Sequence, residues 1–444
     1  MSKNRQGTVD THVLPCVAKS CLGKIVMSRC FVSHCFISFT PLSCNALTLV
    51  VLILVGFQAL MLPAQDSSSR STEPASPTES VTTENLLLSD FSPRSTLEVA
   101  KTDLPHAKFP VIDVHNHFFF RYRGQRERLD EYVRVMDQNN IAISVSLDAV
   151  LGNETDHLKY LGDEYRDRLV PFAHIDFIGD GKKDNPKTWA SSQPGFVRTC
   201  VEQLKVAKEN GILGIKFFKA FGLTNKNADG SLMKIDDTRW DPIWETCGTL
   251  KLPIIIHVAD PVAFFQPIDA NNERLEELGR HPDWSFHGDR FPSREELLAA
   301  RNRVIKRHSK TTFIGAHVAN NGEDLASVGK WLDEYPNLVI EFASRINELG
   351  RQPYSARDFF IKYQDRVLFG TDGPWEDARL KLYWRFLETR DEYFPYSDKQ
   401  PPPQGYWRIY GIHLPDDVLE KVYFRNALRI LPRLQPAYQR ATAK

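Results

Sequence analysis

Five polar side chains of this sequence each come after a short apolar segment. His115 and His117 form a His-x-His pair behind Val-Ile-Asp-Val, and His257 follows three isoleucines. His317 follows Phe-Ile-Gly-Ala, and Asp372 follows Leu-Phe-Gly-Thr. Neutral imidazole nitrogens and carboxylate oxygens are ligands that zinc and similar divalent ions accept in proteins. These residues predict a metal centre, provided that the fold brings them to one place.

Each residue taken alone also has an ordinary structural explanation. A histidine at a strand end often only satisfies a neighbouring polar group, and the Thr-Asp-Gly context of Asp372 suits a turn. However, side chains alternate across a strand, so His115 and His117 share one face. The same arrangement recurs after several apolar segments, which favours a metal centre over separate explanations.

The apolar segments belong to a regular alternation along the chain. Short β-branched and apolar segments alternate with longer amphipathic ones, which indicates a parallel sheet covered by helices. The expected strands are 111–115, 141–147, 170–176, 214–219, 254–258, 312–317, 338–342 and 367–370. The expected helices are 126–139, 196–210, 240–250, 294–308, 324–335, 356–364, 379–392 and 415–431.

Eight such units over about 320 residues predict an α/β fold, specifically a (β/α)8 TIM barrel. The alternative is an open doubly wound sheet, but no Gly-x-Gly-x-x-Gly follows an early strand. In a barrel the C-terminal ends of all strands meet at one mouth, where active sites of this fold lie. We therefore expect the three strand-end histidine motifs and Asp372 to meet there.

Lys216 lies inside the fourth expected strand. A buried ammonium group is costly without a partner. Three outcomes are open: the side chain reaches the surface, it pairs with an acid or a substrate carboxylate, or it reacts with CO2 to form a carbamate that bridges two metals.

Arg121, Arg345 and Trp375 follow the first, seventh and eighth expected strands, close to the mouth. An arginine fork binds a carboxylate with two hydrogen bonds. These residues favour a small organic acid or lactone as the substrate; the alternative is that each arginine forms a surface salt bridge.

The N-terminal part has a different composition. Residues 46–63 are apolar except for Thr48 and Gln58, and basic residues outnumber acidic ones before them. This pattern predicts that residues 1–64 are a cleaved export signal or a single membrane anchor, with the body outside the cytoplasm. Residues 65–105 are rich in Ser, Thr and Pro at their start and predict a disordered linker. The barrel is expected over 106–434.

The overall composition excludes several classes of protein. With 42% hydrophobic residues in 444, the chain can build a sizeable core. Its 56 basic and 56 acidic residues give no net charge, which removes the electrostatic argument for nucleic-acid binding. Beyond residue 44 only Cys200 and Cys247 remain, so the body has no disulfide framework. No feature specifies an oligomeric state.

The motifs together resemble those of the amidohydrolase superfamily, and most closely its amidohydrolase-related (amidohydrolase 2) family. The resemblance extends from Pro110 to Leu431, where the late Asn-Ala-Leu-Arg segment is also similar. It implies a TIM barrel with one divalent metal, usually zinc. The implied metal ligands are His115, His117, His257 and Asp372. The resemblance makes His317 a general base or acid, or a group that polarises bound water; with a carbamylated Lys216 it would instead hold a second metal.

The chemistry of such a site leaves three classes of function open. Zinc lowers the pKa of bound water from ~15.7 to about 7, and Asp372 can take a proton during attack, which suits hydrolysis of an amide, ester or lactone. The resembling family also contains non-oxidative decarboxylases, in which a carbon atom is protonated. The third class is a non-catalytic secreted barrel, against which the intact ligand set argues. Hydrolysis of a small molecule is our first expectation.

Overall fold

The computed structural model describes residues 84–87, 90–91 and 93–443. The chain divides into two units, Met1–Glu79 and Ser80–Lys444, and the described residues all belong to the second. The expected signal or anchor and the first part of the expected linker therefore lie outside the described residues. Among the residues that are described, no helix combines the length and apolarity needed to cross a membrane.

Eight parallel strands form one sheet in the order β1 to β8, and the predicted (β/α)8 barrel is confirmed. The strands are β1 (Val111–Asn116), β2 (Ile141–Val150), β3 (Leu169–His174), β4 (Ile215–Phe217), β5 (Ile254–Ile256), β6 (Phe313–Gly315), β7 (Leu338–Glu341) and β8 (Val367–Leu368). Backbone hydrogen bonds join the last strand region to the first: Asp372 N donates to His115 O at 2.8 Å, and His117 N donates to Gly373 O at 2.8 Å. These bonds place the segment that carries the predicted ligands His115 and His117 beside the segment that carries Asp372.

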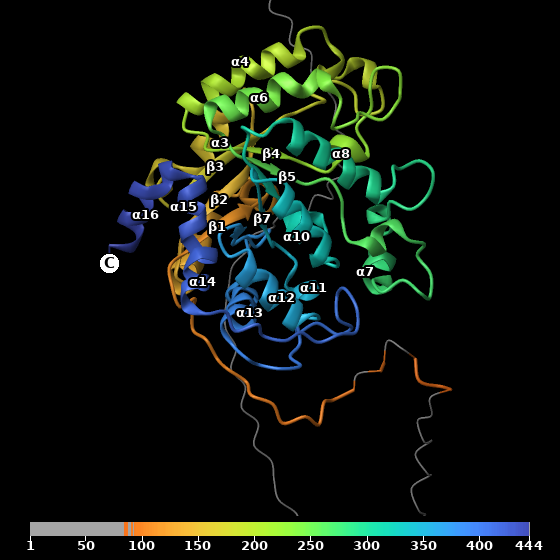
Figure 1. The fold of residues 1–444 in the computed structure, drawn as a ribbon, viewed down its shortest axis with the longest axis vertical. Coiled ribbons are helices and arrows are strands. Elements are labelled where there is room, and N and C mark those ends of the chain that lie inside the picture. Colours follow the sequence, from red (N-terminus) through yellow and green to blue (C-terminus); the bar gives the residue numbers. More distant parts are fainter. Residues whose placement is uncertain (1–83, 88–89, 92, 444) are drawn as a thin grey trace, which may run out of the picture. The chain divides into compact units, whose positions relative to one another are not determined.

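Helices surround the strands, as Figure 1 shows for α4, α6, α8, α10 and α12. The longer helices are α2 (Glu127–Gln138), α3 (Glu154–Leu161), α4 (Phe196–Glu209), α6 (Asp241–Leu250), α8 (Arg294–Arg307), α10 (Leu325–Glu334), α12 (Pro353–Lys362) and α13 (Asp377–Glu388). Helix α8 shows why they form. The Ser293 hydroxyl accepts a hydrogen bond from Glu296 N, acids fill its first turn, and Lys306 and Arg307 fill its last turn.

Short helices interrupt the loops and complete the C-terminal region. They are α1 (Phe118–Tyr122), α5 (Ala220–Leu223), α7 (Leu275–Arg280), α9 (Ala316–Asn320), α11 (Ile346–Leu349), α14 (Asp416–Glu420), α15 (Asn426–Ile430) and α16 (Gln435–Thr442). The single helix expected over 415–431 is instead α14, a π-helical turn at Lys421–Arg425 and α15.

The hydrophobic core has two layers. One lies between the strands and the surrounding helices, where Phe217 meets Trp244 with ring centroids 4.4 Å apart. The other contains Ile255 and Ile314 from the strands and Leu434 and Tyr438 from the C-terminal region. The C-terminal helices therefore pack against the barrel residues in this second layer. The polar residues after the strands gather at the C-terminal ends instead.

Candidate metal centre

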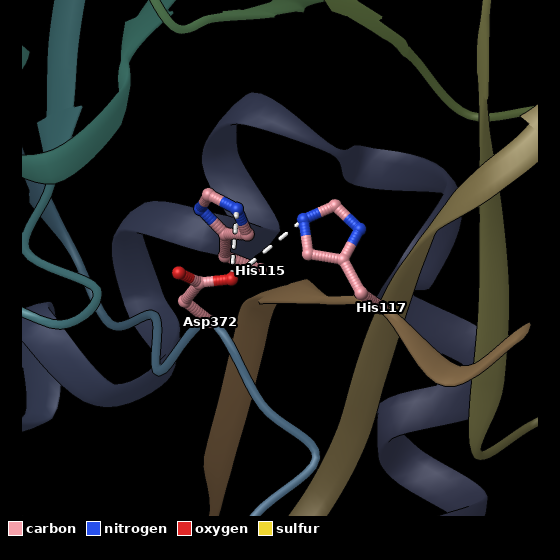
Figure 2. A group of neighbouring side chains, drawn as sticks. All are labelled: His115, His117 and Asp372. Atoms are coloured by element: carbon pink, nitrogen blue, oxygen red, sulfur yellow. Dashed lines mark ion pairs between the residues drawn. The ribbon is translucent and has the colours of Figure 1, made fainter. Parts of the chain in front are cut away.

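Three of the predicted ligands come together at the C-terminal ends of β1 and β8. Ligand atoms of His115, His117 and Asp372 all lie within 4.8 Å of one another. Asp372 Oδ1 is 3.9 Å from His115 Nε2 and 3.7 Å from His117 Nε2. Figure 2 shows this oxygen facing both rings. With bonds of about 2.1 Å, ligands around one zinc ion stand about 3 to 3.5 Å apart, so the spacing fits an ion with a small inward adjustment.

Carboxylates hold the other nitrogen of each of these histidines. His115 Nδ1 lies 2.9 Å from Glu341 Oε1, and His117 Nδ1 lies 2.6 Å from Asp148 Oδ1. Because an ionised carboxylate only accepts hydrogen bonds, both Nδ1 atoms carry the proton and both Nε2 lone pairs face Asp372. Histidines that bind a metal almost always have such a partner, so this arrangement fits a metal site.

Neither carboxylate is among the site residues that the sequence predicts. Glu341 is fully buried in an otherwise apolar strand, and Asp148 is 3% exposed near the end of β2. An acid inside a buried apolar strand needs a partner. An acid in such a strand is therefore the sequence signal that could identify Glu341. Asp148 lies one residue beyond the expected strand 141–147.

His317 and His257 lie together on the β5–β6 side. Their ring centroids are 4.5 Å apart, and the centroid of His317 is 5.0 Å from that of His115. A second group with close ligand atoms consists of His115, His317 and Glu341. His257 belongs to neither group; its Nε2 lies 3.4 Å from Asp260 Oδ1. The structure therefore places His257 beside His317, without bringing it to the three ligands around Asp372.

Lys216 points into the centre of the site. Its Nζ lies 3.3 Å from His115 Nε2, and the residue is 1% exposed. Within the described chain no carboxylate forms an ion pair with it. Of the three predicted outcomes, the surface position and the protein salt bridge are therefore not observed. Burial lowers the pKa of Lys216 from 10.5 to about 8, although Glu341 and Asp372 oppose this shift.

Burial keeps the imidazoles of His115, His257 and His317 neutral. It lowers the pKa of His257 to about 4 and holds the pKa values of His115 and His317 well below 6.5, with Lys216 adding to the shift of His115. Burial alone raises the pKa of Asp372, but nearby positive charge, including that of Arg121 and Lys216, outweighs it and the net shift is downward. At neutral pH these groups are lone-pair donors and proton acceptors, as metal binding requires.

The predicted substrate-binding residues lie beside this group. Arg121 Nη2 donates to Asp372 O at 2.6 Å and to its Oδ1 at 3.3 Å, and its guanidinium lies 4.6 Å from the Trp375 ring. Arg345 is buried and its Nη1 donates to Ser344 O at 2.8 Å. No ion pair to Arg345 occurs among the residues that the structure describes. A buried guanidinium beside the site thus lacks an anionic partner.

Comparison with known proteins identifies the family. The family model described as Amidohydrolase matches residues 112–433, which is most of the chain. The chain belongs to this amidohydrolase family. The amidohydrolase family depends on divalent metals, and the three-ligand group supplies a candidate site for one in this barrel. No curated protein is significantly similar to this chain.

Several solved structures are similar to this chain. A 2,6-dihydroxybenzoate decarboxylase from Rhizobium is 15% identical, with 73% of this chain and 99% of that chain covered and a TM-score of 0.45. A 4-oxalomesaconate hydratase from Rhodopseudomonas palustris is 14% identical, with 74% and 98% covered and a TM-score of 0.39. A TIM-barrel protein from Bordetella bronchiseptica is 14% identical, with 73% and 99% covered and a TM-score of 0.44.

Proposed function

We propose that this protein is a metal-dependent hydrolase that cleaves an amide, ester or lactone bond of a small acidic molecule. One observation carries the proposal: His115 and His117 direct their Nε2 atoms toward Asp372, while Glu341 and Asp148 hold their Nδ1 atoms. A divalent ion bound there, one zinc ion in this proposal, polarises a carbonyl group and lowers the pKa of water to about 7.

Proton transfer at the site favours hydrolysis. Asp372 has a lowered pKa and is therefore an ionised proton acceptor at neutral pH. His317 donates through Nδ1 to Ala343 O at 2.8 Å, so its Nε2 lone pair is free to accept. Hydrolysis needs a base that takes a proton from water, and the site offers two such groups.

Decarboxylation remains the second candidate because of Lys216. That reaction needs a group that delivers a proton to carbon. Lys216 is the candidate donor among the buried residues described here, because its pKa of about 8 leaves it protonated at pH 7. The Lys216→Met variant therefore separates the two reactions: a decarboxylase loses its proton source, whereas a one-metal hydrolase keeps Asp372 and His317.

Product analysis with measured metal content tests the proposal. The purified full chain is assayed for bound zinc and then given lactones, amides, esters and aromatic acids. A new acid with an amine or alcohol supports hydrolysis, and released CO2 supports the decarboxylase. The His117→Ala and Asp372→Asn variants should lose metal or turnover, and Arg440→Ala, which alters an exposed ion pair to Asp167, serves as the control. A chain that binds no divalent metal after gentle purification would point to a non-catalytic barrel.

The proposed acidic substrate rests on Arg345, with Arg121 and Trp375 at the same mouth. An unpaired buried guanidinium gains a bidentate partner when a carboxylate binds. Arg345→Ala should raise KM for an acidic substrate by at least tenfold and leave a neutral analogue nearly unchanged. An equal rise in KM for the acidic substrate and the neutral analogue would contradict the proposal that Arg345 binds a substrate carboxylate.

Export is part of the proposal for residues 1–64. A reporter fused after residue 105 should be active only outside the cytoplasm. Activity confined to the cytoplasm would contradict export, and retention of the reporter in the membrane fraction would distinguish an anchor from a cleaved signal.

A further inference from the structure

The segment that carries His317 has an unusual backbone conformation. His317, Val318, Ala319 and Asn320 have φ values of 56°, 57°, 50° and 57°. Four successive residues thus form a left-handed turn, in which Cβ crowds the following carbonyl oxygen. Val318 adds a β-branched side chain to this crowding. All four residues are buried, so the surrounding structure has to hold the turn in place.

Two arginines of helix α8 bind the carbonyl oxygens of this turn. Arg301 Nη1 donates to Ala319 O. Arg294 Nη2 donates to Asn320 O at 2.5 Å and to Asn321 Oδ1 at 3.0 Å. The two arginines are seven residues apart, which places them on one face of the helix. Together they satisfy two successive carbonyls of the strained turn.

Burying the charged side chain of Arg301 costs free energy, which a purely structural role does not require. Arg301 is fully buried, its guanidinium lies 4.6 Å from the Trp331 ring, and its Nε and Nη2 donate to Asn302 Oδ1 at 3.1 and 2.8 Å. No carboxylate in the described part of the chain pairs with it. Burial lowers its pKa to about 9, so it remains charged at pH 7. Apolar side chains often stabilise such a position better than a buried charge.

The same turn is tied to the segment that follows His257. Asn320 Oδ1 accepts a hydrogen bond at 3.1 Å from the backbone N–H next to His257. Arg294 Nε donates to the Asp260 carbonyl at 3.1 Å. These two hydrogen bonds connect the turn that carries His317 to the segment that follows His257.

We propose that Arg301 and Arg294 are positioning residues, which hold the left-handed turn and so set the His317 ring beside His115 and the His257 ring beside His317. Neither arginine is within the three-ligand group, and each acts through backbone carbonyls of the turn. The effect of these arginines on catalysis rests on the proposed function. Their effect on the positions of the His317 and His257 rings applies to the metal-free protein as well.

Glycine offers a way to test the strain directly. Ala319→Gly removes the Cβ that disfavours the left-handed conformation, at the loss of one methyl group. If Arg301 acts by holding the turn, the Arg301→Met/Ala319→Gly double variant recovers the His317 ring position and the zinc affinity that Arg301→Met loses. Arg301→Lys keeps a hydrogen-bond donor, so its ring position and zinc affinity should change less. Arg303→Met, on the same helix but paired at the surface with Asp236, is the matched control.

The readout is the His317 imidazole of the full chain, stripped of metal by a chelator and labelled with 15N-histidine. Its signal is assigned with His317→Gln. The wild type and Arg303→Met should show a single Nδ1–H tautomer, as the hydrogen bond to Ala343 O requires. Arg301→Met should show a shifted or tautomer-averaged signal, and the double variant should return to the wild-type signal.

Zinc affinity is measured in parallel and should fall about tenfold or more in Arg301→Met, then recover in the double variant, because His317 N donates to Glu341, the carboxylate that holds His115. A folded Arg301→Met chain with an unchanged His317 signal overturns the inference, and so does a double variant that recovers nothing. If Arg301→Met does not fold, Arg301→Lys with and without Ala319→Gly makes the same comparison. A wild type that binds no zinc refutes the proposed function and leaves the imidazole measurement decisive for the turn.

Discussion

Replacing Lys216 by methionine should stabilise the metal-free protein at neutral pH. The pKa of Lys216 falls from 10.5 to about 8 on folding, because burial penalises the ammonium form. Each unit of pKa shift corresponds to about 1.4 kcal/mol, so the charged lysine costs about 3 kcal/mol below pH 8. Methionine has a similar volume and carries no charge, so Lys216→Met should recover most of that free energy.

The stability advantage should depend on pH in a defined direction. Between pH 8 and 10.5 the folded chain has already released the Lys216 proton while the unfolded chain keeps it, so wild-type stability rises with pH in that window. The difference between variant and wild type should therefore shrink toward zero by about pH 10.5. Contributions from titrating groups that do not interact with Lys216 cancel in this difference.

Guanidinium-chloride unfolding of the chelated full chain at pH 7 and pH 10 provides the assay. Lys205→Met, on the exposed face of α4, is the control and should change stability by no more than about 0.5 kcal/mol. A Lys216→Met chain that is less stable than wild type at pH 7 would refute the reasoning, because the lysine would then contribute favourable interactions larger than its burial penalty. A pH-independent gain would show that packing, and not charge, was responsible.

Three further predictions concern the metal and the histidines. Asp148→Asn and Glu341→Gln should each weaken zinc binding about 10- to 100-fold by releasing Nδ1 of a ligand, as competition with a chelating dye would show; unchanged affinity would contradict the assigned roles. Chelation should lower the unfolding temperature, and zinc at 100 times its dissociation constant should restore about 2.7 kcal/mol. An unfolding temperature that does not change when zinc is added would contradict a zinc site in the native fold. His257 has a pKa of about 4 when folded and 6.5 otherwise, so its stability contribution is present above pH 6.5 and lost as pH falls through 4. This contribution is about 3 kcal/mol, and His257→Gln should flatten the acid side of the stability profile.

The fold was predictable because a parallel barrel buries its strands on both faces. Segments such as Ile254–Ile256 then consist of apolar residues alone, and polar residues can follow only where the strand reaches the mouth. This explains why His115 and Asp372, more than 250 residues apart, could be expected to meet. The bounds were less accurate: β6 ends at Gly315, before the histidine that the expected strand 312–317 included.

The details of the site depend on interactions that leave no periodic pattern. His257 illustrates this. It directly follows β5, and His115 lies near the C-terminal end of β1, yet the Nε2 of His257 lies beside Asp260, which Lys219 also binds. A left-handed turn after β6, whose carbonyls are bound by arginines two helical turns apart on α8, sets where its neighbour His317 stands. Backbone strain of this kind is decided by long-range contacts, and the residues in the turn are ordinary Val, Ala and Asn. The ligands could therefore be nominated from strand ends, but the carboxylates and arginines that orient them required the folded arrangement.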